Sequence, residues 1–138
     1  MPKVDKARKM QHWIHAALEN AKAQDIAVLD VRKISDFTDY MVIATGTSNR
    51  HVQSTAEKVV DTLREHDRRP VGVEGKQIGD WILIDCGDVV VHVMRAQTRD
   101  FYNIEKLWSD AKHVGTGATA KTRRPATRAR KKVTEDAT

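Results

Sequence analysis

The strongest constraint on the fold lies in residues 81–94, where two runs rich in β-branched residues flank Gly87-Asp88. Two such runs joined by a two-residue loop that opens with Gly are typical of a tight β-hairpin. If Cys86 and Val89 flank the turn, every further pair of facing residues follows from them. The sequence therefore predicts both the hairpin and its register.

Side chains alternate between the two faces of a strand, so this register sorts the hairpin residues into two sets. One face is wholly apolar and must pack on a core, and it consists of Ile82, Ile84, Cys86, Val89, Val91 and Val93. The other face mixes apolar, acidic and imidazole groups, and it consists of Trp81, Leu83, Asp85, Val90, His92 and Met94. Because Trp81 lies opposite Met94 on this mixed face, the mixed face is the candidate for function.

Hydrophobic periodicity outside the hairpin predicts further helices and strands. Helical patterns span residues 10–21, 49–66 and 98–111, and strand-like runs span 25–31, 40–45 and 71–73. The run at 40–45 is almost entirely apolar, which favours a central strand covered on both faces. The element order is α-β-β-α-(β)-β-β-α, so we predict one α/β domain at residues 1–114, with helices packed on a mixed β-sheet.

The last part of the chain is basic. Residues 115–138 hold seven Lys or Arg and two acids, a net charge of +5, which equals the net charge of the whole chain. Because this stretch has no apolar period, we predict a disordered tail. Spaced cations attract phosphates without sequence preference, so RNA contact is predicted for Arg123, Arg124, Arg128, Arg130, Lys131 and Lys132. A tail that only increases solubility is the alternative.

Composition argues against several classes of protein. A hydrophobic content of 40% and a charged content of 31% are typical of a soluble globular domain. No apolar run approaches the ~20 residues of a membrane span, and the N-terminus lacks the apolar segment of a signal peptide. Cys86 is the single cysteine, so an internal disulfide and a cysteine-rich zinc site are excluded. We expect a cytoplasmic protein without a metal or a cofactor.

One segment raises the question of catalysis. Gly46-Thr47-Ser48 follows a strand and precedes a helix, as in a phosphate cradle and in the turn of nucleotidyltransferases. That chemistry needs two or three carboxylates that converge on Mg²⁺, and Asp85 and Asp88 are not spaced to share a strand face. A plain helix cap is the favoured interpretation. An enzyme that binds Mg-nucleotide at Gly46–Ser48 is the alternative hypothesis.

The mixed face of the hairpin suggests a patch that binds another protein. Trp and Met are enriched in the cores of interfaces, and Trp contributes a disproportionate share of binding energy. The predicted patch consists of Trp81, Met94, Asp80, Leu83, Asp85 and His92. Ordinary packing beneath a helix is the alternative.

The same residues resemble a known family, the ribosomal silencing factors, also called iojap-like proteins. The likeness runs from about residue 6 to residue 109. It comprises Gly46-Thr47-Ser48, Arg50-His51, Gly72-Val73-Glu74-Gly75, Asp80-Trp81, Gly87-Asp88-Val89, His92-Val93-Met94, Arg99, Phe101-Tyr102 and Glu105-Lys106-Leu107-Trp108. So many segments in one order make the resemblance specific. It does not extend to the tail after Val114.

The resemblance implies a domain that is related in fold to nucleotidyltransferases but lacks their catalytic carboxylates, and hence is not an enzyme. It implies a factor that binds protein number fourteen of the large ribosomal subunit, blocks joining with the small subunit and represses translation when nutrients are scarce. It places the tryptophan of the Asp80-Trp81 pair on the binding surface. It also implies that a homodimer forms in some settings.

Overall fold

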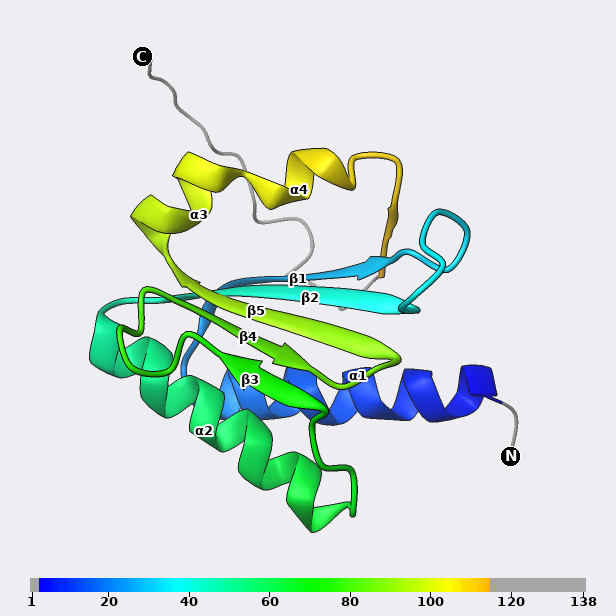
Figure 1. Ribbon diagram of the computed structural model, residues 1–138, viewed down its shortest axis with the longest axis horizontal. Helices are drawn as coiled ribbons and strands as arrows, with labels where there is room; N and C mark the ends of the chain where they lie inside the picture. The colour runs from blue at the N-terminus through cyan, green and yellow to red at the C-terminus, as the bar shows by residue number, and fades with distance from the viewer. Residues whose placement is uncertain (1–2, 115–138) are drawn as a thin grey trace.

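Residues 3–114 are described by the computed structural model, and they form a six-stranded mixed sheet with helices on both faces (Figure 1). The helices are α1 (Lys3–Asn20), α2 (Asn49–Glu65), α3 (Ala96–Tyr102) and α4 (Ile104–Leu107). The strands are β1 (Gln24–Asp30), β2 (Tyr40–Gly46), β3 (Gly72–Glu74), β4 (Trp81–Asp85), β5 (Val89–Arg95) and β6 (Lys112–His113). They lie in the order β3-β4-β5-β2-β1-β6, which confirms the predicted α/β class.

Strands β2 and β5 are parallel, and every other neighbouring pair in this sheet is antiparallel. The hairpin of β4 and β5 has the predicted register, with Trp81 facing Met94. At the turn, the Cys86 N–H donates to the Val89 carbonyl oxygen at 2.9 Å. Gly87 has a φ of +81°, a conformation that costs glycine little and other residues more. The turn chemistry therefore sets the pairing of both strands.

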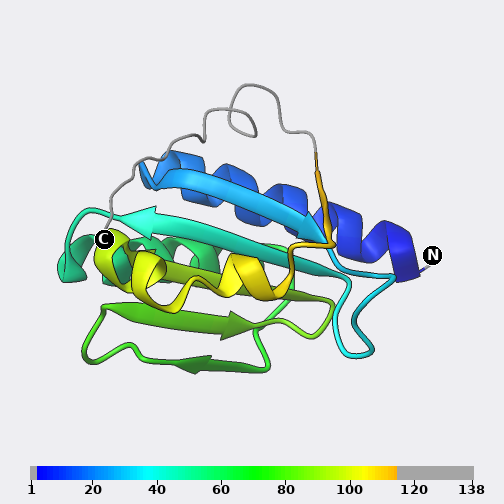
Figure 2. The same ribbon diagram turned by 90° about the horizontal axis from the view of Figure 1, so that it is seen from above.

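The sheet carries one helical layer on each face. Helices α1 and α2 lie below it in Figure 1, and α3 and α4 lie above it. Viewed from above, α3 and α4 lie over its middle strands and run roughly along them (Figure 2). Every residue of β2 is buried, because alternate residues such as Val42 and Ile43 belong to the core on opposite faces. The prediction of a central strand covered on both faces is confirmed.

Helix α2 begins where the sequence indicates. The Ser48 hydroxyl oxygen accepts a hydrogen bond from the His51 N–H at 3.0 Å, which satisfies one of the free donors of the first turn. Gly46 permits the close approach of strand and helix, because a Cβ there would lie 2.6 Å from Val52 Cγ2. His66 caps the other end of the helix.

The C-terminal part of the fold differs from the prediction of one helix over 98–111. Asn103 adopts a left-handed conformation, with a φ of 44°, and separates α3 from α4. Helix α3 begins at Ala96, two residues before the predicted start at residue 98. The two-residue strand β6 was not predicted, because pairing with β1 stabilises it and its own sequence is too short to indicate a strand.

The predicted tail, residues 115–138, lies outside the described residues, and its RNA contact stays a prediction. Among residues 3–114, no helix combines the length and the apolar character that a membrane span requires.

Candidate protein-binding surface

Trp81 opens β4 on the sheet face that α3 covers, and its side chain is half-buried. Its indole Nε1–H donates a hydrogen bond to Nδ1 of His92 at 3.0 Å. Its ring also contacts the ring of Tyr102, with 4.9 Å between the ring centroids. The indole is therefore held by one polar and one aromatic contact while part of it faces solvent.

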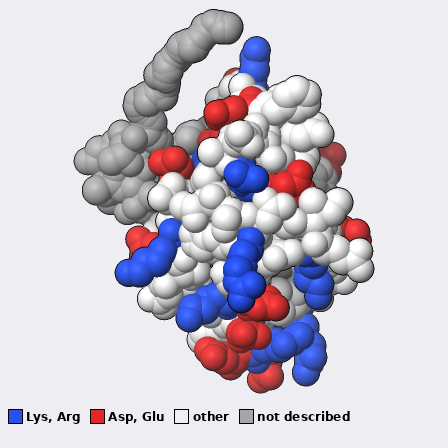
Figure 3. Space-filling view, turned by 90° about the vertical axis from the view of Figure 1, so that its left-hand side faces the viewer, with Lys and Arg blue, Asp and Glu red and all other residues white. Residues whose placement is uncertain are grey.

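Two exposed aromatic side chains of α3 extend the surface formed by Trp81. Tyr102 is 54% exposed and Phe101 is 80% exposed, and their rings meet edge to face with centroids 4.9 Å apart. We call Trp81, Tyr102 and Phe101 the aromatic ridge. Figure 3, which views the left-hand side of Figure 1, shows uncharged surface over much of the upper part of the molecule. Charged side chains of both signs gather lower down on this face.

A shallow hollow of about 340 Å³ lies at the foot of the ridge. It is lined by Glu74, Gly75, Asp80, Trp81, Leu83 and Tyr102. Its charged members are both acidic, so the hollow suits a partner that presents Lys or Arg side chains. Such a cation would also find aromatic faces within the same hollow.

The structure separates the predicted patch residues by depth. Asp80 is exposed and Leu83 is half-buried, and both line the hollow together with Trp81. Asp85 lies at the far end of β4, where its carboxylate accepts a hydrogen bond from the Gly87 N–H at 2.9 Å. Asp85 therefore stabilises the hairpin turn and does not line the hollow.

Two predicted patch residues lie beneath the surface. Met94 is 0% exposed and belongs to the core under α3 and α4, and His92 is 6% exposed. The prediction that their side chains lie at the surface is therefore wrong for the monomer. The hairpin register correctly placed both on the mixed face, but the helices that follow β5 fold back over that face.

Burial decides the charge state of His92. It lowers the pKa of the imidazole from 6.5 to about 4, so the ring is neutral near neutral pH. An indole N–H only donates, so Nδ1 of His92 must be the unprotonated nitrogen that accepts. Burial, together with the neighbouring charge of Asp85, raises the pKa of the Cys86 thiol to about 12. The thiol is therefore protonated near neutral pH, and Cys86 is half-buried against the core.

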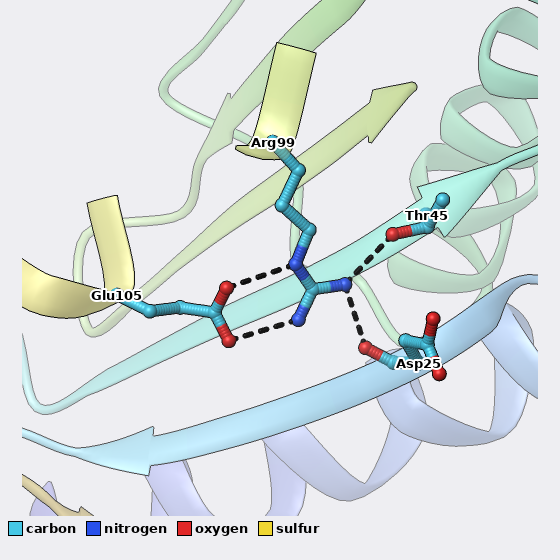
Figure 4. A network of polar contacts seen from close by, with 4 residues as sticks. All are labelled: Asp25, Thr45, Arg99 and Glu105. Carbon is cyan, nitrogen blue, oxygen red and sulfur yellow. Dashed lines mark hydrogen bonds and ion pairs between the residues drawn. The ribbon is translucent and has the colours of Figure 1, made fainter. Parts of the chain in front are cut away.

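Arg99 fastens α3 to the sheet (Figure 4). Its Nε and Nη2 atoms donate to the two carboxylate oxygens of Glu105 at 2.9 Å each. Its Nη1 atom donates to the Asp25 carbonyl oxygen at 2.7 Å and to the Thr45 hydroxyl oxygen at 2.8 Å. One guanidinium thus joins α3, α4 and the adjoining ends of β1 and β2, and it holds the helix that carries two ridge residues.

Sequence reasoning assigned no role to Tyr102 or to Arg99, although both fall in the family-like segments. Tyr102 is distant from Trp81 in sequence, and Arg99 meets partners on two strands far earlier in the chain. The sequence signal that could have indicated a role for Tyr102 was the adjacent aromatic pair Phe101-Tyr102 in a short amphipathic segment.

Two groups of the Gly46-Thr47-Ser48 turn, the Thr47 N–H and the Ser48 hydroxyl, bond to His51. The Thr47 N–H donates to Nδ1 of His51 at 2.9 Å, and the His51 N–H donates to the Ser48 hydroxyl. Nε2 of His51 in turn donates to the Ala21 carbonyl oxygen at 2.7 Å. Within the described part of the chain, no three His, Cys, Asp or Glu side chains are grouped as metal ligands would be. The turn is a helix cap.

Comparison with known proteins gives concordant results. The family model described as "RsfS: Ribosomal silencing factor during starvation" matches residues 4–138, so the match continues past Val114, where the sequence resemblance was expected to end. A ribosomal silencing factor of Chromobacterium violaceum is 47% identical over 96 residues, which are 70% of this chain and 79% of that protein. The mouse protein named mitochondrial assembly of ribosomal large subunit protein 1 is 38% identical over 95 residues, 67% of this chain and 42% of that protein.

A solved structure agrees with the fold. A crystal structure of a protein from Chromobacterium violaceum superposes with a TM-score of 0.73 at 41% sequence identity. The superposition covers 83% of this chain and 95% of that chain. The arrangement of helices on a six-stranded mixed sheet is therefore shared with a solved relative.

Proposed function

We propose that this chain, which belongs to the ribosomal silencing factor family, binds the large ribosomal subunit and prevents its joining with the small subunit. The family consists of non-enzymatic ribosome-binding factors, so the alternative of a nucleotidyltransferase-like enzyme is wrong. Consistent with this, the Thr47 N–H and the Ser48 hydroxyl of the Gly46–Ser48 turn both bond to His51, as in a helix cap. The function must then come from binding to a partner and from the volume that the bound domain occupies.

The aromatic ridge is the observation that best supports a docking role. Trp and Tyr are the residues most often found where truncation costs an interface most energy. Here a half-buried Trp81 is followed by Tyr102 and Phe101, which expose large apolar rings without a covering element among the described residues. A standard interface buries ~800 Å² on each partner, an area that one face of a domain this size can supply.

Charge favours a protein partner for the ridge over RNA. Glu74 and Asp80 border the hollow and would repel a phosphate backbone, whereas they attract Lys and Arg side chains. The resemblance in sequence implies protein number fourteen of the large subunit. We therefore assign the ridge and hollow to that ribosomal protein, with Trp81 at the centre of the contact.

The proposed mechanism is steric. The ridge docks on the ribosomal protein at the face where the subunits meet, and the rest of the domain occupies space that the small subunit requires. The basic tail, if it contacts ribosomal RNA, adds sequence-independent affinity without changing which surface is covered.

The central test is Trp81→Ala in the full chain, with binding to purified large subunits measured by co-sedimentation. We expect the dissociation constant to rise about thirtyfold or more, the effect of losing a residue worth about 2 kcal/mol at an interface. Light scattering of mixed subunits should show that the variant no longer prevents joining.

A matched control is Trp13→Ala. Trp13 is also half-buried, but it stacks on His66 in the layer of α1 and α2, on the opposite face of the sheet. Its loss should leave ribosome binding unchanged. A Trp81→Ala protein with cooperative thermal unfolding and undiminished co-sedimentation would show that the docking surface lies elsewhere.

A further inference from the structure

We propose that His92 is a positioning residue for the interface: its Nδ1 atom holds the indole of Trp81 in the orientation that the partner meets. The inference rests on the proposed role of Trp81 and adds the reason why that side chain is ready to bind before the partner arrives. His92 itself does not touch the partner.

The hairpin register creates the contact. Trp81 faces Met94 and Leu83 faces His92, so Trp81 and His92 are diagonal neighbours on one face of the sheet. At this spacing a long side chain reaches across, and the indole Nε1–H donates to Nδ1 at 3.0 Å. The two ring centroids are 5.9 Å apart and the rings are tilted by 46°, so they touch at an angle and do not stack.

The hydrogen bond joins the half-buried indole to a buried side chain. His92 is 6% exposed and fixed within the sheet, whereas Trp81 is only half-buried. The ring of Tyr102 contacts the indole as well. The hydrogen bond therefore selects one rotation of the indole, and the tyrosine ring supports it.

Preorganisation has a measurable consequence for affinity. A large side chain that is free to change rotamer must be immobilised on binding, and that cost falls when the rotamer is set beforehand. For one side chain the cost corresponds to about a three- to tenfold change in dissociation constant. Removal of the acceptor should therefore weaken binding by about that factor while leaving the indole itself in place.

Two substitutions separate positioning from packing. In His92→Asn the side-chain Oδ1 occupies a position equivalent to Nδ1 and accepts the same hydrogen bond. In His92→Leu the volume is largely kept but the acceptor is lost. We expect His92→Leu to bind large subunits about three- to tenfold more weakly, and His92→Asn to bind within about twofold of the wild type.

The free protein provides a readout that does not depend on ribosome binding. The indole N–H signals of ¹⁵N-labelled full-length chain report hydrogen exchange, and the Trp81 signal is identified by its loss in Trp81→Phe. We expect slow exchange of this proton in the wild type and in His92→Asn, and faster exchange in His92→Leu.

The outcomes are distinguishable. If the Trp81 indole N–H of the wild type exchanges as fast as an exposed indole, the inference is overturned whether or not any His92 variant folds. If His92→Leu binds as the wild type does while Trp81→Ala does not bind, the inference fails and the proposed function stands. Equal losses in His92→Leu and His92→Asn would assign His92 to packing alone. Undiminished binding by Trp81→Ala would instead refute the docking surface itself.

Discussion

Single residues of the mixed hairpin face have different tasks because they lie at different depths. Trp81 is half-buried and has neighbours that leave part of it accessible, whereas Met94 and His92 are buried. Asp85 is occupied at the turn. A side chain's face is thus a weaker guide to function than what covers it, and Trp81 and Leu83 are the members of this face that stay half-buried and line the hollow.

Burial of His92 predicts a specific pH dependence of stability. The unfolded chain takes up a proton at this residue near pH 6.5, whereas the folded protein does so only near pH 4. The contribution of His92 to the free energy of unfolding is therefore fully present above about pH 6.5, and it is lost as the pH falls toward 4. We expect a loss of about 2 kcal/mol between about pH 7 and pH 5 from this residue.

The measurement is urea unfolding of the wild type and of His92→Asn at both pH values. The wild type should lose about 2 kcal/mol more than the variant, which has no imidazole at this position. Asp30, whose pKa is lowered chiefly by its hydrogen bond from Arg32, contributes only at lower pH. An equal loss in both proteins would mean that His92 is not kept neutral by the fold.

At the scale of elements, α3 and α4 form a thin layer that depends on Arg99. Neither helix is long, and α3 contributes no buried residue of its own. The guanidinium makes four hydrogen bonds to partners on α4, β2 and the start of β1. The layer that presents Tyr102 and Phe101 is therefore fixed mainly by polar contacts and by the side chains packed beneath α4.

We expect Arg99→Met to lower the free energy of unfolding by about 2 kcal/mol, because the methionine leaves the Thr45 hydroxyl and the Glu105 carboxylate without this partner. The Arg99 side chain is 11% exposed and the Glu105 side chain is 33% exposed, so water replaces only part of the lost contact with Glu105. Arg64→Met is the control, because Arg64 and Asp61 are exposed and 3.6 Å apart. That change should cost less than about 0.5 kcal/mol in urea unfolding. Similar costs in the two variants would contradict a special role for Arg99.

At the scale of the whole molecule, charge is unevenly distributed along the sequence. The basic excess of the chain lies in residues 115–138, and the remainder has a net charge of zero. A ridge with an acidic hollow and a separate run of cations suit a ribosome, which presents both basic protein and RNA phosphate. The two parts would then act on different components of one particle.

Deletion of residues 115–138 should weaken binding to large subunits, mainly at low salt. Phosphate contacts release counterions, so the wild type should lose affinity with rising salt more steeply than the shortened chain. The measurement is the slope of the logarithm of affinity against the logarithm of salt concentration. Trp81→Ala is the control, because it should lower the affinity but reduce this slope less than the deletion does. The same slope with and without residues 115–138 would argue that the tail does not contact RNA.

Much of the fold could be predicted from local patterns. The turn at Gly87 and the alternation on either side of it determined the β4–β5 register, and the apolar run at 40–45 identified a strand buried on both faces. The Gly46-Thr47-Ser48 segment located the start of α2, and the structure identifies Ser48 as its cap. Each of these depends on residues near one another in the chain, because turn conformation, capping and side-chain alternation are short-range effects.

The candidate surface could be predicted only in part, because burial and contact are decided by segments that are distant in sequence. The sequence determined that Trp81, His92 and Met94 share a face. The tertiary structure decided that α3 and α4 return over that face, bury His92 and Met94, and bring Tyr102 against the indole. The physical reason is that a strand's periodicity sets the direction of each side chain, whereas the helix that covers it is chosen by packing and hydrogen bonds across the whole domain.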